Sequence, residues 1–192
     1  AEVKVSKKKT VLVELDEGVT PTTAEGLAKL GPAEKGGIHS FGAQTFPADG
    51  NVGFIVTNRE KAKELSADPK VEIQVVSYGF SRVNPGFMAS APVPAAEMAL
   101  ANAGLKITDM KAIKSHNPFT TNDLNFAKKF NIDVMKMNNY GSSLIYGHPQ
   151  APTAGRIIAE MLEEMVLIGG GYCLWAGCAA GDTGASMIFK VG

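Results

Sequence analysis

From about residue 71 to its last residues, the chain alternates between apolar segments typical of strands and amphipathic segments typical of helices. The expected strands span residues 71–78, 112–114, 172–177 and 186–191, and the expected helices span residues 92–103, 120–130 and 156–167. The last two strands are joined by a glycine-rich turn, which predicts a hairpin. Strands that alternate with helices in this way predict a layered α/β fold in which helices cover the sheet.

The first 50 residues have no comparable pattern. A short apolar strand is expected at residues 11–13, and a long loop rich in glycine and proline follows it. Residues 52–56 are expected to form a buried strand, and residues 59–65 carry helix formers that are expected to start a helix. An irregular stretch of this length is unusual inside a compact domain. We therefore expect it either to be functional or to lie against something outside this chain.

Size and charge exclude several classes of partner. A chain of 192 residues can bury a sizeable core and form one domain, or one domain and a fragment. Lys and Arg number 19 and Asp and Glu number 19, so the formal net charge is zero and no nucleic-acid partner is expected. No apolar run approaches the roughly 20 residues of a membrane span, and the first residues do not form a secretory signal. No membrane partner is therefore expected.

The two cysteines, Cys173 and Cys178, lie five residues apart across an expected strand. Odd spacing on a strand directs side chains to opposite faces, so a disulfide between these two is not favoured. Reduced thiols are typical of cytoplasmic proteins, and we expect a cytoplasmic location. Three histidines and two cysteines at these spacings form no ligand cluster, so no metal is expected.

Glycines gather around two reactive side chains. The chain holds 21 glycines in 192 residues, about 11% against about 7% in ordinary proteins, and they concentrate at residues 141–147 and 169–184. His148 and Cys178 lie at these places, and glycine lets the backbone approach a ligand closely. A glycine before His148 and a proline after it also restrict the direction of its imidazole. The clustering favours a functional site, although a polar turn before a helix explains the Gly-His-Pro sequence equally well.

Three short stretches at the ends of expected elements carry groups suited to one reaction. Asn117 lies where a strand gives way to a helix, His148 precedes the long helix, and Cys178 adjoins the hairpin turn. An amide, an imidazole and a thiol that converge on one cleft can stabilise an oxyanion or enolate and transfer a proton. Acyl transfer and carbon–carbon bond formation at a thioester need these abilities. Each stretch also has a simpler explanation: an ordinary turn at Asn117, a small buried cysteine, or, at His116, a polar group that only satisfies a partner.

The order of these stretches resembles the C-terminal half of the thiolases, the acetyl-CoA acetyltransferase family. The similar segments are residues 16–33, 42–50, 87–100, 116–119, 147–149, 154–156 and 177–181. The resemblance implies the thiolase fold, an α/β fold with the layers α/β/α/β/α, of which this chain would supply the C-terminal half. Residues 1–66 would end the N-terminal thiolase domain and include its returning loop, and residues 67–192 would form the C-terminal thiolase domain.

The resemblance also implies roles for single residues. His148 would activate a nucleophilic cysteine and contribute to an oxyanion hole, in which Asn117 positions a water. Cys178 would be the acid/base that takes or returns the α-proton, and the backbone N–H of Ala180 would lie in a second oxyanion hole. The residues at the substrate, along the acyl or pantetheine path, would be Thr45, Met88, Phe119 and Gly147. The substrate would be a coenzyme A thioester, with no further cofactor.

The main departure from the family is the nucleophile, which thiolases carry in their N-terminal half. Cys173 matches no nucleophile motif, so we expect the chain to be inactive alone. Its partner would be an N-terminal thiolase half that carries the cysteine, in a hetero-oligomer of the dimer-of-heterodimers type. A separate gene is favoured over proteolysis because Ala1 is compatible with removal of an initiator Met. Two smaller departures leave the acyl-chain preference and the reaction direction open. One is Pro118, in the stretch where the family has Asn-Glu-Ala-Phe. The other is Ala179-Ala180 after the cysteine.

The expected function is thiolytic cleavage or Claisen condensation of 3-oxoacyl-CoA and acetyl-CoA, shared with the partner chain. Two alternatives remain. One is a non-catalytic thiolase-like subunit that binds acyl-CoA or stabilises a paralogous active chain. The other is an acyltransferase whose acceptor is not a carbon nucleophile.

Overall fold

The computed structural model describes residues 2–16 and 18–192. Its centre is a four-stranded sheet with the order β3-β6-β5-β4. In this order the strands are Ile73–Arg82, Thr183–Val191, Gly171–Ala179 and Met110–His116. β4 and β5 run parallel, whereas β6 runs antiparallel to both of its neighbours. The predicted terminal hairpin is confirmed, because β5 and β6 follow one another and pair from residue 171 to residue 191.

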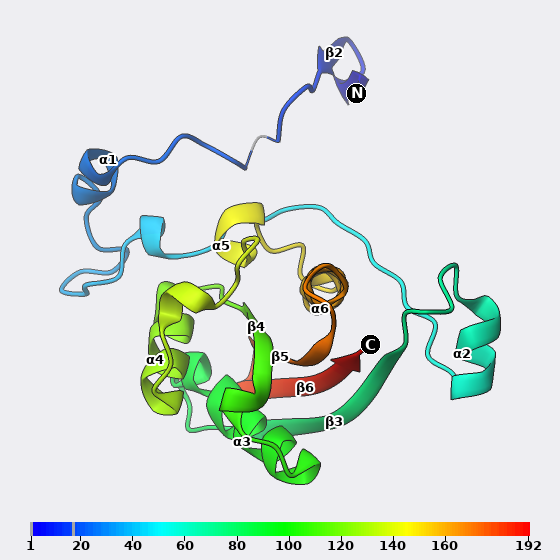
Figure 1. Ribbon diagram of the computed structural model, residues 1–192. Coiled ribbons are helices and arrows are strands. Elements are labelled where there is room, and N and C mark those ends of the chain that lie inside the picture. The colour runs from blue at the N-terminus through cyan, green and yellow to red at the C-terminus, as the bar shows by residue number, and fades with distance from the viewer. Residues whose placement is uncertain (1, 17) are drawn as a thin grey trace.

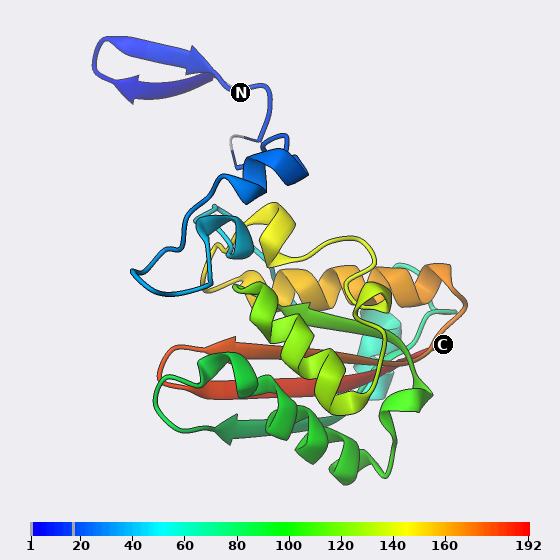
Figure 2. The same cartoon turned by 90° about the vertical axis from the view of Figure 1, so that its left-hand side faces the viewer.

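Helices cover both faces of this sheet (Figures 1 and 2). α3 (Pro92–Ala103) and α4 (Thr120–Phe130) pack on one face, and α6 (Thr153–Leu167) packs on the other. The predicted layered α/β architecture is therefore confirmed. Among the described residues, no helix has both the length and the apolar character needed to cross a membrane.

Side chains along β5 alternate between the two cores of the molecule. Leu174 and Ala176 pack with α3 and α4, whereas Cys173 and Trp175 pack with α6. Period-two alternation is a property of every strand, and it carries Cys178 to the face opposite Cys173. Both cysteines are buried, and they lie on the opposite faces that their spacing predicted.

The helix boundaries follow from their caps. α2 (Arg59–Leu65) begins where the Asn58 side chain accepts a hydrogen bond from the Lys61 N–H at 2.9 Å. α3 begins with a proline and ends before Gly104, whose φ of +66° is the left-handed conformation that glycine adopts at little cost. α3 and α4 start and end at the predicted residues, α2 starts where a helix was expected to start, and α6 starts three residues earlier than predicted.

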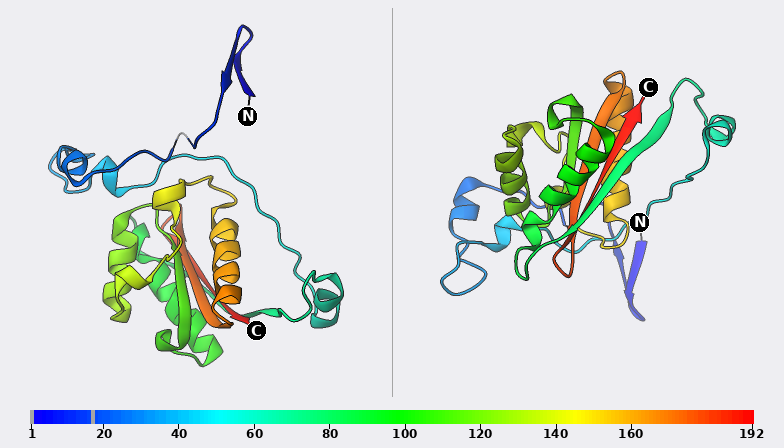
Figure 3. Two further views of the ribbon diagram at one scale, coloured as in Figure 1. Left: turned by 45° about the horizontal axis from the view of Figure 1, so that its top comes forward. Right: turned by 90° about the horizontal axis from the view of Figure 1, so that it is seen from below.

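The remaining elements are short. They are β1 (Glu2–Ser6), β2 (Lys9–Leu12), α1 (Ala24–Ala28), α5 (Ser143–Tyr146) and the 3-10 helices η1 (Phe41–Ala43), η2 (Met88–Ser90), η3 (Ile107–Asp109) and η4 (Val134–Lys136). β1 and β2 pair with each other in a separate small sheet. This hairpin projects away from the main domain. α2 also lies apart from the main domain, in a different direction (Figures 1 and 3).

The expectation of a buried strand at residues 52–56 is wrong for this chain. The structure has no strand there, and Phe54, Ile55 and Val56 are exposed. A strand needs a neighbour for its backbone hydrogen bonds, and the described part of the chain supplies none beside this segment. The segment just before it does pack on the domain, since Gln44 forms a β-bridge with Phe119 and Pro47 forms one with His148.

Candidate functional site

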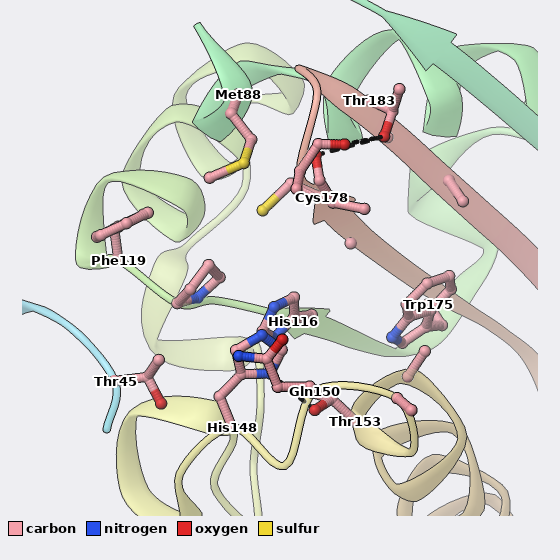
Figure 4. Close-up of a pocket in the computed structure, with 18 of the residues that line it drawn as sticks. Thr45, Met88, His116, Phe119, His148, Gln150, Thr153, Trp175, Cys178 and Thr183 are labelled. Carbon is pink, nitrogen blue, oxygen red and sulfur yellow. Dashed lines mark hydrogen bonds between the residues drawn. The ribbon is translucent and has the colours of Figure 1, made fainter. Parts of the chain in front are cut away.

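One cavity of about 660 Å³ lies at the end of the sheet where β4 and β5 finish and β6 begins (Figure 4). Of the eight residues predicted to form the site, six line this cavity: Thr45, Met88, Phe119, His148, Cys178 and Ala180. Gly147 and Asn117 are not in its wall. The residues come from five separate parts of the chain, so the fold brings together most of what the sequence predicted to converge.

The Gly147-His148 pair is held tightly against the segment that precedes α2. Gly147 has φ +80°, and a Cβ there would lie 2.6 Å from the Cβ of Ala48 and 2.8 Å from the ring of Phe46. Only glycine therefore fits. The N–H of His148 donates to the carbonyl of Phe46 at 2.8 Å, and its Nδ1 lies 2.8 Å from the Oγ1 of Thr153. His148 is thus held by one hydrogen bond at its backbone N–H and by another at its ring.

A second histidine lies beside the first, although the sequence did not assign it to the site. His116 is the last residue of β4, and its ring centroid is 4.4 Å from that of His148. Its Nδ1 lies 2.7 Å from the Oγ of Ser143. Burial lowers the pKa of His116 to about 4, with further lowering by His148 and Arg156. Burial also lowers the pKa of His148, so both rings are neutral at neutral pH.

Asn117 turns away from the cavity, contrary to the expected convergence. Residues along β4 alternate, so Ala112, Lys114 and His116 face α6, whereas Ser115 and Asn117 face α4. The Nδ2 of Asn117 donates to Asp123 at 2.5 Å, and the residue is 2% exposed. The structure therefore places the imidazole of His116 in the wall, where an amide was predicted. The alternation along β4 distinguishes the two residues, but the strand expected from the sequence, residues 112–114, ended before His116.

Asp123 is the centre of a buried polar cluster behind this turn. Its carboxylate accepts hydrogen bonds from Ser115 Oγ, from Asn117 Nδ2 at 2.5 Å and from Asn138 Nδ2 at 3.2 Å. Burial raises the pKa of Asp123, and these three hydrogen bonds oppose that rise. Because the donors come from β4 and from the segment before α5, the cluster fixes the end of β4 against α4.

Cys178 approaches the cavity from the α4 side of the sheet. The residue is 7% exposed, and the Nδ2 of Asn122 lies 3.4 Å from its Sγ. Burial raises the pKa of the Cys178 thiol. Burial and the nearby Glu164 raise the pKa of Cys173 to about 12. Neither sulfur is thus held as a thiolate by this chain, and Cys178 is suited to give a proton.

The turn after Cys178 is held in place from two sides. The Asp182 carboxylate accepts the N–H of Gly86 at 3.0 Å, and its backbone carbonyl accepts the N–H of Val83 at 2.9 Å. The Thr183 hydroxyl lies 3.3 Å from the carbonyls of Ala179 and Ala180 (Figure 4). These contacts fix the backbone at Ala180, the predicted oxyanion position.

The opposite wall is formed by the segment at Thr45. Its N–H donates to the carbonyl of Pro118 at 2.8 Å, and its hydroxyl donates to the carbonyl of Ser143. Phe119 also borders the cavity, and Met88 borders it on the side of Cys178 (Figure 4). Within residues 2–16 and 18–192, no group of three or more His, Cys, Asp or Glu side chains is placed to hold a metal ion.

Comparisons with known proteins agree with this architecture. Residues 69–191 match the model of the thiolase C-terminal domain family. The chain is 34% identical over 187 residues to an acetyl-CoA acetyltransferase of Syntrophomonas wolfei and 32% identical over 191 residues to human mitochondrial 3-ketoacyl-CoA thiolase. These alignments cover 96% and 98% of this chain but 47% of each relative, so the chain spans about half the length of the curated relatives it matches.

Solved structures are similar over the same range. The crystal structure of human mitochondrial 3-ketoacyl-CoA thiolase superposes with a TM-score of 0.81 at 30% identity. The acetyl-CoA acetyltransferase of Bacillus anthracis superposes with a TM-score of 0.82 at 25% identity. Each superposition covers 99% of this chain and 48% of the other chain. The chain belongs to the thiolase family and has the fold of its C-terminal half.

Proposed function

We propose that this chain supplies the C-terminal half of the active site of an acyl-CoA C-acyltransferase. The enzyme would cleave 3-oxoacyl-CoA with coenzyme A or form it by Claisen condensation. The observation that carries this proposal is the meeting of the His116 and His148 imidazoles and the Cys178 thiol at one cavity. Relatives named acetyl-CoA acetyltransferase and 3-ketoacyl-CoA thiolase support the same chemistry. The substrate would be a coenzyme A thioester, with no further cofactor.

The two imidazoles are suited to stabilise an oxyanion. Each ring has its Nδ1 next to a hydroxyl, that of Ser143 for His116 and that of Thr153 for His148. A neutral imidazole whose Nδ1 accepts a hydrogen bond carries its proton on Nε2. In that tautomer each Nε2–H can donate to a thioester oxygen as negative charge develops on it. Donors fixed in advance stabilise such charge without reorganisation.

Cys178 would transfer the proton. In condensation its thiolate takes a proton from the α-carbon of the acetyl thioester: the C–H bond breaks, the S–H bond forms, and the electron pair moves to the thioester oxygen as an enolate. The enolate carbon then attacks the acyl group held on the nucleophilic cysteine, whose sulfur leaves as a thiolate. In cleavage the same bonds change in reverse, and the Cys178 thiol returns its proton to carbon.

The nucleophilic cysteine would be carried by the N-terminal thiolase half. This part of the proposal is supported by the raised pKa values of Cys173 and Cys178, since a nucleophilic thiol needs a lowered pKa. We propose a separate partner chain and a dimer of heterodimers. Two unpaired cysteines favour a reducing compartment such as the cytoplasm. We propose the division at residues 66 and 67 as the boundary between the two thiolase domains.

The decisive experiment compares this chain alone with this chain plus an N-terminal thiolase half supplied in trans. Thiolysis of acetoacetyl-CoA is followed by the loss of its absorbance. Activity is expected only in the mixture. Activity of the chain alone would refute the shared site.

Cys178→Ala in the assembled enzyme tests the role of the thiol. We expect the exchange of the α-proton and the condensation rate to fall about 10²–10⁴-fold, the usual contribution of a positioned acid/base, while acylation of the partner's cysteine continues. The matched control is Cys173→Ala, which removes the other thiol from the opposite face of β5. If Cys178→Ala lowered only the melting temperature, a scaffolding role would be favoured instead.

A further inference from the structure

Asn122 connects the reactive sulfur to two backbone groups. It is the third residue of α4 and is 3% exposed. Its Oδ1 accepts the N–H of Phe119 at 3.2 Å, and its Nδ2 lies 3.3 Å from the carbonyl of Ala89 and 3.4 Å from the Sγ of Cys178. A backbone N–H can only donate and a backbone carbonyl can only accept, so the amide has one possible orientation. One N–H of Asn122 therefore points at the sulfur.

We infer that Asn122 is a positioning residue for Cys178, whose amide N–H stabilises the thiolate form of that cysteine during proton transfer. The inference rests on the proposed function, because it assumes that Cys178 exchanges a proton with the substrate. When the α-proton moves from carbon to sulfur, the sulfur loses its charge. When the thiol returns the proton, the charge reappears at the end of the Asn122 N–H. The donor thus stabilises the thiolate, which is the form of the sulfur that burial destabilises.

The surroundings of the sulfur leave the thiolate dependent on this side-chain donor. Burial raises the pKa of Cys178, and the hydrogen bonds from Asn122 and from the backbone of Cys178 oppose the rise. The other titratable side chains that line the cavity are His116 and His148, and their lowered pKa values keep them neutral. No charged side chain in the described wall of the cavity therefore compensates for the loss of the amide.

The other two hydrogen bonds of Asn122 keep the donor in place. The Phe119 N–H lies at the start of α4, and Ala89 lies in η2 next to Met88. Neither bond depends on the protonation of the sulfur, so the N–H needs no reorganisation when the charge appears. Met88 and Cys178 lie on the same side of the cavity (Figure 4), so the same amide also couples the sulfur to the predicted acyl-binding segment.

The test measures the pKa of Cys178 through the pH dependence of its alkylation by iodoacetamide in the full chain. Peptide mass spectrometry counts Cys178 separately from Cys173. Asn122→Asp keeps the shape and the acceptor for Phe119 but replaces the donor with an anion. Below the thiol pKa we expect alkylation to slow about tenfold or more, because hydrogen bonds to charged groups are strong. Above that pKa the rates should converge. Asn102→Asp, the same change at an exposed site on α3, is the matched control and should leave the profile unchanged.

Circular dichroism establishes that each variant is folded. Should Asn122→Asp fail to fold, Asn122→Ala carries the same comparison with a smaller expected slowing, about threefold to tenfold. An unchanged profile in a folded variant, or an equal slowing at every pH, would overturn the inference, since the second result means altered access and not an altered pKa. Alkylation requires no catalysis. A shifted thiol pKa without any shift in the pH profile of the assembled enzyme would therefore count against the proposed function and not against the contact.

Discussion

The histidine pair makes the stability of the protein depend on pH. The folded chain holds the pKa of His116 at about 4, against the ordinary 6.5, because the ring is buried. As the pH falls below about 6.5 the unfolded chain binds a proton that the folded chain does not, so the free energy of unfolding decreases until about pH 4. The loss from this residue is on the order of 3 kcal/mol.

His116→Asn tests this contribution. Asn keeps a polar atom near the Oγ of Ser143 but removes the titration. We measure the free energy of unfolding in urea at pH 7 and at pH 4.5. We expect the difference between the two values to be smaller for the variant than for the wild type. Asp123, whose raised pKa acts in the opposite direction, is present in both chains, so the comparison isolates His116. An equal pH dependence in the two proteins would contradict the assigned cause.

At the residue scale, the sequence predicted which residues line the cavity better than it predicted the directions of their side chains. His148 and Cys178 were found because glycines surround them, and Gly147 proved to need a positive φ and the space of a missing side chain. His116 and Asn117 are neighbours, and the choice between them depends on the last residue of β4. That boundary is set by pairing with β5, where His116 lies opposite Gly177, and a single segment of sequence does not contain this pairing.

At the element scale, α3 packs unusually close to β3. A Cβ at Gly79 would lie 2.1 Å from the carbonyl oxygen of Ala95 and 2.7 Å from the N of Ala99. The serines two residues to either side donate to carbonyls of this helix and of the residue before it, Ser77 to Ala99 at 2.7 Å and Ser81 to Ala91 at 2.6 Å. The small residues Ser77, Gly79 and Ser81 on one face of β3 thus allow the helix to approach.

Gly79→Ala tests this close approach. We expect the free energy of unfolding of the variant to be lower by about 3 kcal/mol, since overpacking against backbone atoms forces the helix to move. For a chain of this size that corresponds to a melting temperature lower by about 6–12 °C. Gly53→Ala is the matched control, because a Cβ there meets nothing within 4 Å and its φ is outside the left-handed region. Similar melting temperatures for both variants would show that the contact between α3 and β3 accommodates an extra methyl group, contrary to this expectation.

The elements that the sequence predicted correctly carry their own boundary signals. α2 has a side-chain cap at Asn58, and α3 has a proline at its start and a glycine after its end. Residues 52–56 have the composition of a buried strand but lack a strand beside them. Composition reports what a segment prefers, whereas a strand also requires a neighbouring strand, and the described residues supply none beside this segment.

At the scale of the whole molecule, the first 66 residues present apolar side chains that the domain does not cover. Leu15, Ile38, Ile55 and Val56 are 83%, 102%, 79% and 81% exposed. For the first 50 of these residues, the sequence predicted a segment that is functional or that lies against something outside the chain. The path of this region could not be predicted, because most of its described residues are exposed and packing within the chain does not fix them. In the proposed enzyme these side chains would face the N-terminal thiolase half.

Ile55→Asp tests whether residues 52–56 form part of that contact. A carboxylate at an interface that buries this position costs several kcal/mol, so binding to an N-terminal thiolase half, measured by isothermal titration calorimetry, should weaken at least tenfold. The chain alone should keep its melting temperature, because Ile55 makes no buried contact in it. Met135→Asp is the matched control, since Met135 is 82% exposed and lies in η4, in the C-terminal domain. If the two variants bound the partner equally well, residues 52–56 would not belong to the interface, and their exposure would need another explanation.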